Sequence, residues 1–376
     1  MDVDVIATYR CNSRCAMCNV WRYPSLPDDE VSLDTMDRLP FGIDHLGLTG
    51  GEPTLRRDLQ EIVDLMYPKA MVLEISSNGL HAERLEPIVR KYPNIKIRFS
   101  LDGQELTNNR IRGEQGGYQK KVRGLLRLKE LGATDLGFAV TIQDDNAAEL
   151  VDLFSFAQHC RVELATSALH NGFQFHKNDN YPYDRLRVAR HIQELVVAQL
   201  KTSNVKNWFR AYMSLGLIAK VLGHNRLLTC SAGSNFVFVD PWSDVYACNV
   251  RPDLRLGNLK AQQWQEIIDG PDAHVVRQKV ASCNQSCWMV GSAKIAMRHP
   301  RFTRMPTIGP LAWVVENKLR VALGLQVQFS RYIDYSAVQV DGVIPPRISN
   351  LDRTVQRRVQ SASDRLYDSV GEFVNR

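Results

Sequence analysis

The chain has 376 residues, of which 44% are hydrophobic and 23% are charged, and its formal net charge at pH 7 is +6. This composition is typical of a globular protein, and it excludes a disordered chain, a collagen and a small disulfide-stapled protein. No apolar run approaches the ~20 residues of a membrane-spanning helix, and the N-terminus shows no secretory signal, so we expect a cytoplasmic protein.

The excess positive charge belongs to the C-terminal part of the chain. Residues 291–376 contain 13 Lys and Arg against 7 Asp and Glu, and residues 1–290 are neutral. We therefore expect no nucleic-acid partner. The basic extension is either a solvated surface or a peripheral contact with an anionic partner such as lipid headgroups.

Apolar spacing and turn residues predict alternating strands and helices over the first 168 residues. The expected strands are residues 3–8, 46–49, 72–76, 95–101, 136–142 and 162–165, and the expected helices are residues 59–66, 85–89, 122–131 and 147–157. Such alternation is typical of βαβ units and predicts an α/β fold with a parallel sheet.

Several unusual residues come directly after predicted strands. They are Cys11, Gly50, Ser77, Asp102 and Asp144. In parallel α/β folds, ligand sites are built from the loops at the C-terminal ends of the strands. The sequence therefore predicts one site at one end of the sheet.

The pattern changes after a long helical stretch over residues 185–221, in which a break is expected near residues 203–204. Short strands at 236–239 and 245–247, joined by a turn, precede a helix at 264–268. We predict three units: a core over residues 1–221, a small α+β domain over 222–290 and a basic extension over 291–376. The extension contains a candidate amphipathic helix at 308–323.

Seven of the eight cysteines form two groups, which in a chain without an export signal indicates metal binding. Cys160 stands alone at a predicted helix end, where we expect a buried small hydrophobe. The first group, Cys11, Cys15 and Cys18, has the spacing C-x3-C-x2-C on one loop. Three thiolates can hold three irons of a [4Fe–4S] cluster and leave the fourth iron open, although zinc or plain thiols remain alternatives.

The first cysteine group resembles the signature of the radical S-adenosylmethionine (radical SAM) superfamily, which implies a partial (β/α)6 barrel. Met17 stands where the family usually has an aromatic residue, and we expect Trp21 to supply aromatic packing nearby. The other positions that resemble family motifs, and that are thereby implied to bind SAM, are Gly50, Gly51, Glu52, Pro53, Ser77, Asn78, Ser100, Asp102, Arg112 and Thr141.

The resemblance also implies roles for some of these residues. The turn that contains Glu52 would receive the methionyl ammonium of SAM, because a carboxylate accepts a charge-assisted hydrogen bond. Ser100 would contact the ribose, Arg112 the methionyl carboxylate, and the strand around Thr141 the adenine. For Arg112, a surface ion pair is the alternative.

The chemistry implied by the resemblance is a radical reaction. The reduced cluster cleaves SAM to methionine and a 5′-deoxyadenosyl radical, which abstracts hydrogen from an unactivated C–H bond. A flavodoxin or ferredoxin is implied as the electron donor. A non-enzymatic iron–sulfur electron carrier or redox sensor is the alternative, but it would need neither an open iron nor a SAM-binding turn.

The second cysteine group resembles the auxiliary-cluster domain of the same superfamily, known as SPASM or, in its one-cluster form, twitch. It comprises Cys230, Cys248, Cys283 and Cys287. Four thiols can close a second [4Fe–4S] cluster completely, and a zinc site is the alternative. A closed cluster would transfer electrons or hold the shape of the domain rather than bind substrate.

The substrate is less well defined by the sequence. The first strand begins at residue 3, so we expect no N-terminal peptide-binding domain and favour a small or carrier-linked substrate, such as a sugar, cyclitol or nucleoside. The alternative is a maturase that modifies a ribosomal peptide or protein. Glu163, His170 and His176 are candidate substrate contacts at or beyond the sixth strand, and ordinary packing or surface roles are the alternative for each.

Overall fold

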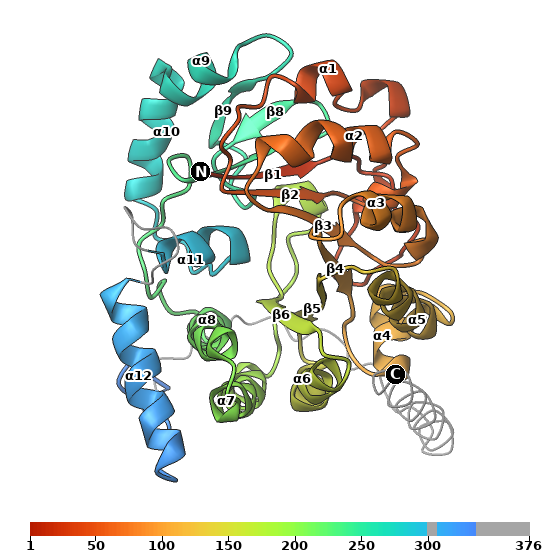
Figure 1. The fold of residues 1–376 in the computed structure, drawn as a ribbon. Helices are drawn as coiled ribbons and strands as arrows, with labels where there is room; N and C mark the ends of the chain where they lie inside the picture. The colour runs from red at the N-terminus through yellow and green to blue at the C-terminus, as the bar shows by residue number, and fades with distance from the viewer. Residues whose placement is uncertain (299–306, 336–376) are drawn as a thin grey trace.

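One continuous sheet organises the computed structural model, which describes residues 1–298 and 307–335 (Figure 1). Within these residues the sheet has nine strands in the order β6-β5-β4-β3-β2-β1-β7-β8-β9. The strands are β1 (Asp2–Ile6), β2 (His45–Thr49), β3 (Leu73–Ser77), β4 (Lys96–Ser100), β5 (Asp135–Ile142), β6 (Glu163–Ala168), β7 (Phe236–Val239), β8 (Asp244–Tyr246) and β9 (Arg255–Asn258).

Strands β1 to β6 are parallel and lie side by side in chain order, as expected for successive βαβ units. β7 continues the sheet from the other side of β1 and is also parallel to it, with Val3 paired to Leu46 on one side and to Val237 on the other. The last pairs, β7–β8 and β8–β9, are antiparallel. The fold is therefore α/β with a parallel sheet and an antiparallel C-terminal region.

Helices surround the outside of the curved sheet in Figure 1. The α-helices are α1 (Leu33–Met36), α2 (Leu59–Met66), α3 (Glu86–Lys91), α4 (Glu105–Arg112), α5 (Gly117–Glu130), α6 (Leu150–His159), α7 (Arg185–Lys201), α8 (Val205–Val221), α9 (Trp264–Asp269), α10 (Pro271–Ala281), α11 (Val290–Ala296) and α12 (Ile308–Ala322). The 3-10 helices are η1 (Val20–Arg22), η2 (Pro27–Asp29), η3 (Pro53–Leu55), η4 (Tyr67–Lys69), η5 (Ala82–Leu85), η6 (Ala147–Glu149) and η7 (Phe173–Phe175). Among the described helices, none combines the length and the apolar character needed to cross a membrane.

The apolar pattern of the sequence explains why these segments pack together. The central strands are buried on both faces, so their apolar residues form near-continuous runs, as in β7, whose four residues are all buried. On α2, the apolar residues Leu59, Ile62, Val63 and Met66 have helical spacing and are all buried. Cys160, expected to be a small hydrophobe, is fully buried in the same core.

Several predicted boundaries are confirmed by local hydrogen bonds. The helix predicted at 59–66 is α2 itself. The predicted break near residues 203–204 separates α7 from α8, because the Asn204 side chain accepts a hydrogen bond from the Lys206 N–H and caps α8. Besides the 3-10 helices, five elements were not predicted: α1, α4, α10, α11 and β9. α4 is largely polar along its length and β9 has only four residues, so neither offers a long apolar pattern.

The sheet crosses the predicted domain boundary near residue 222. Strands β7 to β9 follow that boundary in the sequence, yet β7 pairs with β1. The division into residues 1–221, 222–290 and 291–376 thus stays a prediction. In the C-terminal extension, the predicted helix at 308–323 is present as α12, and residues 299–306 and 336–376 lie outside the described part.

Gly216 on α8 provides a test of this packing. A Cβ atom at this position would overlap the buried indole of Trp288, whose Nε1 donates a hydrogen bond to the Met213 carbonyl at 2.9 Å. We expect Gly216→Ala to lower the free energy of unfolding by about 1–3 kcal/mol, the usual effect of overpacking. Denaturant unfolding should show this loss.

Gly309→Ala is the matched control, because a Cβ atom there meets nothing within 4 Å. It replaces a glycine with alanine in a helix without a clash and should leave stability unchanged or slightly increased. Equal stability of the two variants would contradict the proposed packing constraint.

Candidate functional site

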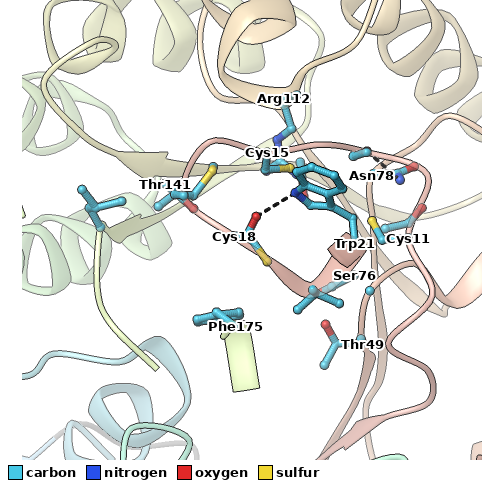
Figure 2. Close-up of a pocket in the computed structure, with 18 of the residues that line it drawn as sticks. Cys11, Cys15, Cys18, Trp21, Thr49, Ser76, Asn78, Arg112, Thr141 and Phe175 are labelled. Carbon is cyan, nitrogen blue, oxygen red and sulfur yellow. Dashed lines mark hydrogen bonds between the residues drawn. The ribbon is translucent and has the colours of Figure 1, made fainter. Parts of the chain in front are cut away.

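The first cysteine group and the ends of the parallel strands meet around one cavity of about 180 Å³ (Figure 2). The predicted residues that line it are Cys11, Cys15, Cys18, Gly50, Gly51, Ser77, Asn78, Ser100, Arg112, Thr141 and His170. Met17 and Trp21 also line it, and the Trp21 indole donates a hydrogen bond to the Cys18 carbonyl at 3.0 Å. The structure therefore brings together residues at or after the ends of the six strands β1 to β6, with Arg112 from α4.

Some of the lining residues were not predicted from the sequence. Thr49 and Ser76 lie at or next to the ends of β2 and β3, where their hydroxyl groups join those of Ser100 and Thr141 from β4 and β5. A hydroxyl residue within the last two positions of consecutive parallel strands was the available signal. Ser13, Val20, Leu169 and Phe175 also line the cavity, but they come from irregular or short segments without such a signal.

The cysteine loop is held mainly by the end of α4. Backbone N–H groups of Arg14 and Ala16 donate to the carbonyls of Arg112 and Ile111 at 3.0 and 2.8 Å. On the other side, the Asn78 amide donates to the Asn12 side chain at 2.6 Å. These contacts fix the loop although it contains no strand or helix before residue 20.

The two glycines of the predicted SAM-binding turn are required by the neighbouring backbone. Gly50 has φ of +152°, and a Cβ atom there would crowd the backbone of Thr8. At Gly51 a Cβ atom would crowd the backbone of Arg10. The turn is then fixed to residues 8–10 by hydrogen bonds from the N–H groups of Gly51 and Glu52, at 2.7 and 2.8 Å.

Glu52 and Pro53 do not line the cavity. The Glu52 carboxylate is fully buried and accepts hydrogen bonds from the Ser77 hydroxyl at 2.9 Å and the Asn78 N–H at 2.5 Å. The Thr54 N–H and hydroxyl also donate to it. In the structure Glu52 therefore ties the glycine turn to the end of β3, which places Ser77 and Asn78 in the cavity wall.

Arg112 forms a buried ion pair rather than a surface one. Its Nε donates to the Asp102 carboxylate at 2.6 Å, and its Nη1 lies 3.7 Å from the Cys15 sulfur. Asp102 stands behind the cavity wall, where it also accepts a hydrogen bond from the Thr141 N–H at 2.6 Å. The pair thus connects β4, β5 and α4 with the cysteine loop.

The three thiols suit an iron–sulfur cluster. Burial raises the pKa of Cys11 to about 12 and that of Cys18 to about 11, and it raises the pKa of Cys15 against the influence of Arg112. Thiolates here need a compensating positive charge, which iron supplies. Within the described residues, no group of three or more His, Cys, Asp or Glu side chains forms a ready site for a single metal ion. A cluster takes one thiolate per iron, so its ligands need not converge on one point.

His170 presents a bare ring nitrogen at the cavity. Its Nδ1 lies 3.1 Å from the Ala168 carbonyl and must donate to it, so Nε2 carries no proton in the neutral ring. Burial lowers the pKa of His170 to about 3, which keeps the ring neutral. Nε2 is buried and has no hydrogen-bond partner among the residues that the structure describes. It can therefore accept a hydrogen bond from a bound ligand.

The other two substrate candidates lie elsewhere. His176 does not line the cavity; its ring packs against Tyr9 and Tyr23 with centroid distances of 5.8 and 4.6 Å. Glu163 begins β6 and so lies at the opposite end of the sheet from the cysteines. This position corrects the expectation that it faces the radical, which arose because the sequence pattern ended the strand at residue 165 rather than 168.

Glu163 belongs to an ionic network. It pairs with Arg98, Lys206 and Arg210. Burial alone would raise the pKa of Glu163, but Arg210 and Arg98 lower it to about 2. It lines a separate cavity of about 660 Å³, away from the thiols.

The four cysteines of the second group lie close enough to influence one another's charge. Cys230 interacts electrostatically with Cys287 and Cys283, and Cys248 with Cys287 and Cys230. Burial raises the pKa of Cys248 to about 11 and also raises that of Cys230. The cluster predicted here would thus compensate buried thiolates, as at the first group.

Donors to sulfur surround this second group. Arg226 Nη1 lies 3.3 Å from the Cys287 sulfur, and the Val250 N–H donates to the Cys248 sulfur at 3.3 Å. Arg251 interacts electrostatically with Cys283. Such cations and N–H groups stabilise thiolate ligands, so the donor set fits an iron–sulfur cluster.

The loop after β6 connects the two cysteine groups. Phe175 lines the first cavity, and Phe173 contacts Tyr246 with a centroid distance of 5.1 Å. Tyr246 precedes Cys248 by two residues. Lys220 of α8 lies between the groups as well: its Nζ donates to the Ala168 and Leu169 carbonyls, and it interacts electrostatically with Cys287.

Two family models match the chain. Residues 5–157 match the radical SAM superfamily, and residues 230–289 match the iron–sulfur cluster-binding domain called SPASM. These matches confirm the resemblances drawn from the two cysteine groups. They imply binding of SAM and of [4Fe–4S] clusters.

Curated relatives share part of their length with this chain. The mycofactocin maturase MftC of Mycolicibacterium smegmatis is 26% identical over 250 residues, which are 64% of this chain and 62% of the maturase. The match thus spans less than two thirds of that relative. The pre-heme d1 synthase of Dinoroseobacter shibae is 25% identical over 296 residues, 70% of this chain and 72% of the synthase.

Solved structures share the fold. The structure described as native anSMEcpe with bound AdoMet and Cp18Cys peptide has a TM-score of 0.57, covering 86% of this chain and 96% of that chain. Sequence identity is 15%, so this likeness supports the architecture alone.

Iron content tests the assignment of the two cysteine groups. Anaerobically prepared protein is expected to contain about eight irons per chain, and the Cys11/Cys15/Cys18→Ala triple variant about four, since each group holds one cluster. The comparison requires iron and acid-labile sulfide analysis.

Cys160→Ala serves as the matched control, because this cysteine belongs to the core and should leave the iron content unchanged. A wild-type value of about four irons that falls to none in the triple variant would contradict a cluster at the second group.

Proposed function

We propose that this chain, which belongs to the radical SAM superfamily and carries a SPASM-type iron–sulfur cluster-binding domain, is an enzyme that modifies a peptide by radical chemistry. The main support is the convergence of three thiols and the Gly50–Gly51 turn around one cavity. The backbone of Gly50 and Gly51 is expected to bind the methionyl ammonium of SAM. The three thiols are the expected ligands of the cluster.

The cavity residues then have distinct tasks. When bound, a reduced [4Fe–4S] cluster supplies the electron that cleaves SAM and yields a 5′-deoxyadenosyl radical. Arg112 offers a guanidinium to the methionyl carboxylate while Asp102 holds it in place. Ser100 would contact the ribose, and the strand around Thr141 would contact the adenine. The second cysteine group would hold a cluster for electron transfer, and a flavodoxin or ferredoxin would supply the first electron.

A peptide substrate is supported by the relatives. MftC is named a maturase, and the solved structure of similar fold is described as holding a bound peptide.

A small-molecule substrate is the second candidate. The similarity to pre-heme d1 synthase supports it. A protease would destroy a peptide substrate but would leave a small molecule intact, which distinguishes the two candidates.

The experiment measures 5′-deoxyadenosine formed by the anaerobic full chain with dithionite and SAM. Wild type should form it and Cys11→Ala should not, because the first cluster lacks a ligand. A low-molecular-weight extract of the producing cells should stimulate formation, and digestion of that extract with a broad-specificity protease should abolish the stimulation. Stimulation that survives digestion would favour the small-molecule candidate, and no 5′-deoxyadenosine from wild type would contradict the radical SAM activity.

His170 offers a sharper test within the same site. We expect its bare Nε2 to accept a hydrogen bond from a substrate N–H. His170→Asn keeps an N–H donor near the position of Nδ1 but removes the Nε2 acceptor. The variant should lower the extract-stimulated rate of 5′-deoxyadenosine formation about tenfold, which corresponds to the loss of one hydrogen bond. SAM affinity should remain unchanged.

His170→Gln is the matched variant, since its amide oxygen lies near the position of Nε2 and should retain most of the rate. Equal losses in both variants would exclude hydrogen-bond acceptance by Nε2. A weakened SAM affinity in His170→Asn would instead assign the residue to the SAM side of the cavity.

A further inference from the structure

Helix α12 has two apolar faces, and only one of them is covered. Pro310, Trp313, Val314 and Asn317 are buried, and the Trp313 ring lies 5.6 Å from that of Tyr212 on α8. The opposite face consists of five exposed aliphatic residues. They are Ile308, Leu311, Val315, Leu319 and Leu323, with exposed fractions between 43% and 86%.

These five residues form one stripe. Their spacing of three, four, four and four residues aligns them along one side of a helix with 3.6 residues per turn. The helix ends at this point, because Gly324 turns the chain with φ of +72°, and the next residue, Leu325, is also 52% exposed. In Figure 1, α12 lies at the outer edge of the molecule, beyond α8. We call this surface the α12 stripe.

Charged residues border the α12 stripe but do not interrupt it. Glu316, Lys318 and Arg320 project between the exposed and the buried face, as their helical positions require. Lys318 Nζ is held at the border by the Leu200 and Thr202 carbonyls, and Arg320 Nε by the Gln326 carbonyl. A contiguous exposed apolar surface of this kind marks a contact site.

The chemistry of the α12 stripe favours lipid over a protein partner. Protein interfaces obtain most of their binding energy from Trp, Tyr and Arg anchors, whereas this stripe contains only Ile, Leu and Val. The whole net charge of +6 also belongs to residues 291–376, which contain α12. Aliphatic side chains on an exposed helix within a basic region are complementary to acyl chains beneath anionic headgroups.

We propose that the α12 stripe binds the surface of a membrane that contains anionic lipid. α12 would lie parallel to the membrane surface. Its five exposed aliphatic side chains would reach the first acyl carbons, while the opposite face, which contains Trp313, would stay packed against the rest of the protein. This mode needs no spanning helix, and none occurs among the described residues. This contact would hold the enzyme at the membrane surface whether its substrate is a peptide or a small molecule.

Vesicle flotation of the anaerobic full chain tests the proposal. Wild type should float with vesicles of phosphatidylcholine containing phosphatidylglycerol, and less with phosphatidylcholine alone. Leu311→Glu/Leu319→Glu should reduce the floated fraction at least about tenfold, because two carboxylates replace the centre of the stripe. Both residues are exposed, so the variant should keep wild-type iron content and 5′-deoxyadenosine formation.

The matched control is Met71→Glu/Val275→Glu, which makes the same charge change at two exposed apolar residues outside the stripe. It should float like wild type. Equal loss in both double variants would mean that net charge alone governs binding, and equal flotation with both vesicle types would exclude the anionic requirement; each result overturns the proposal.

Absence of wild-type flotation would also overturn it and would leave two other occupants to distinguish. A dimer in sedimentation velocity that Leu311→Glu/Leu319→Glu dissociates would assign the stripe to a second copy of the chain. A monomer whose arginines between residues 353 and 365 become more sensitive to trypsin in that variant would assign it to the chain's own C-terminal segment.

Discussion

The position of the cysteine loop depends on the end of α4, where backbone hydrogen bonds and one buried ion pair act together. Between β1 and η1 the chain has no regular structure, and yet three thiols have to be held in a fixed arrangement. Arg112 and Asp102 provide the link: the pair spans α4 and the end of β4, accepts the Thr141 N–H of β5, and brings a guanidinium toward Cys15. Separating the two residues would leave a buried charge without a partner, which costs free energy. The ion pair therefore opposes any movement of α4 and the cysteine loop away from β4 and β5.

The sequence indicated most of the fold and the composition of the site, because strand ends and cysteine spacing are local signals. It could not indicate what each polar group bonds to. The motif around Glu52 was visible, but its hydrogen bonds to Ser77 and Asn78 depend on the neighbouring β3. Glu163 was placed at the wrong end of β6 because Thr166, Ser167 and Ala168 continue the strand without large apolar residues.

The two cysteine groups lie on either side of the loop that follows β6. This loop carries Leu169, His170 and Phe175 into the cavity and Phe173 toward Tyr246. Lys220 holds its start through two carbonyls and also interacts with Cys287. A ligand that contacts His170 therefore touches a segment whose other side borders the second group, so substrate binding and the environment of the second cluster share one structural element.

The pairing of β1 with both β2 and β7 has a consequence for biosynthesis. β1 leaves the ribosome long before its partner β7, which begins at residue 236. Throughout synthesis of the intervening chain, one edge of β1 exposes unpaired backbone groups, and such edges promote association between chains. A fragment that ends at residue 221 would keep this open edge permanently. Expression of the barrel without the second cysteine group is thus a route to aggregation rather than to a simpler enzyme.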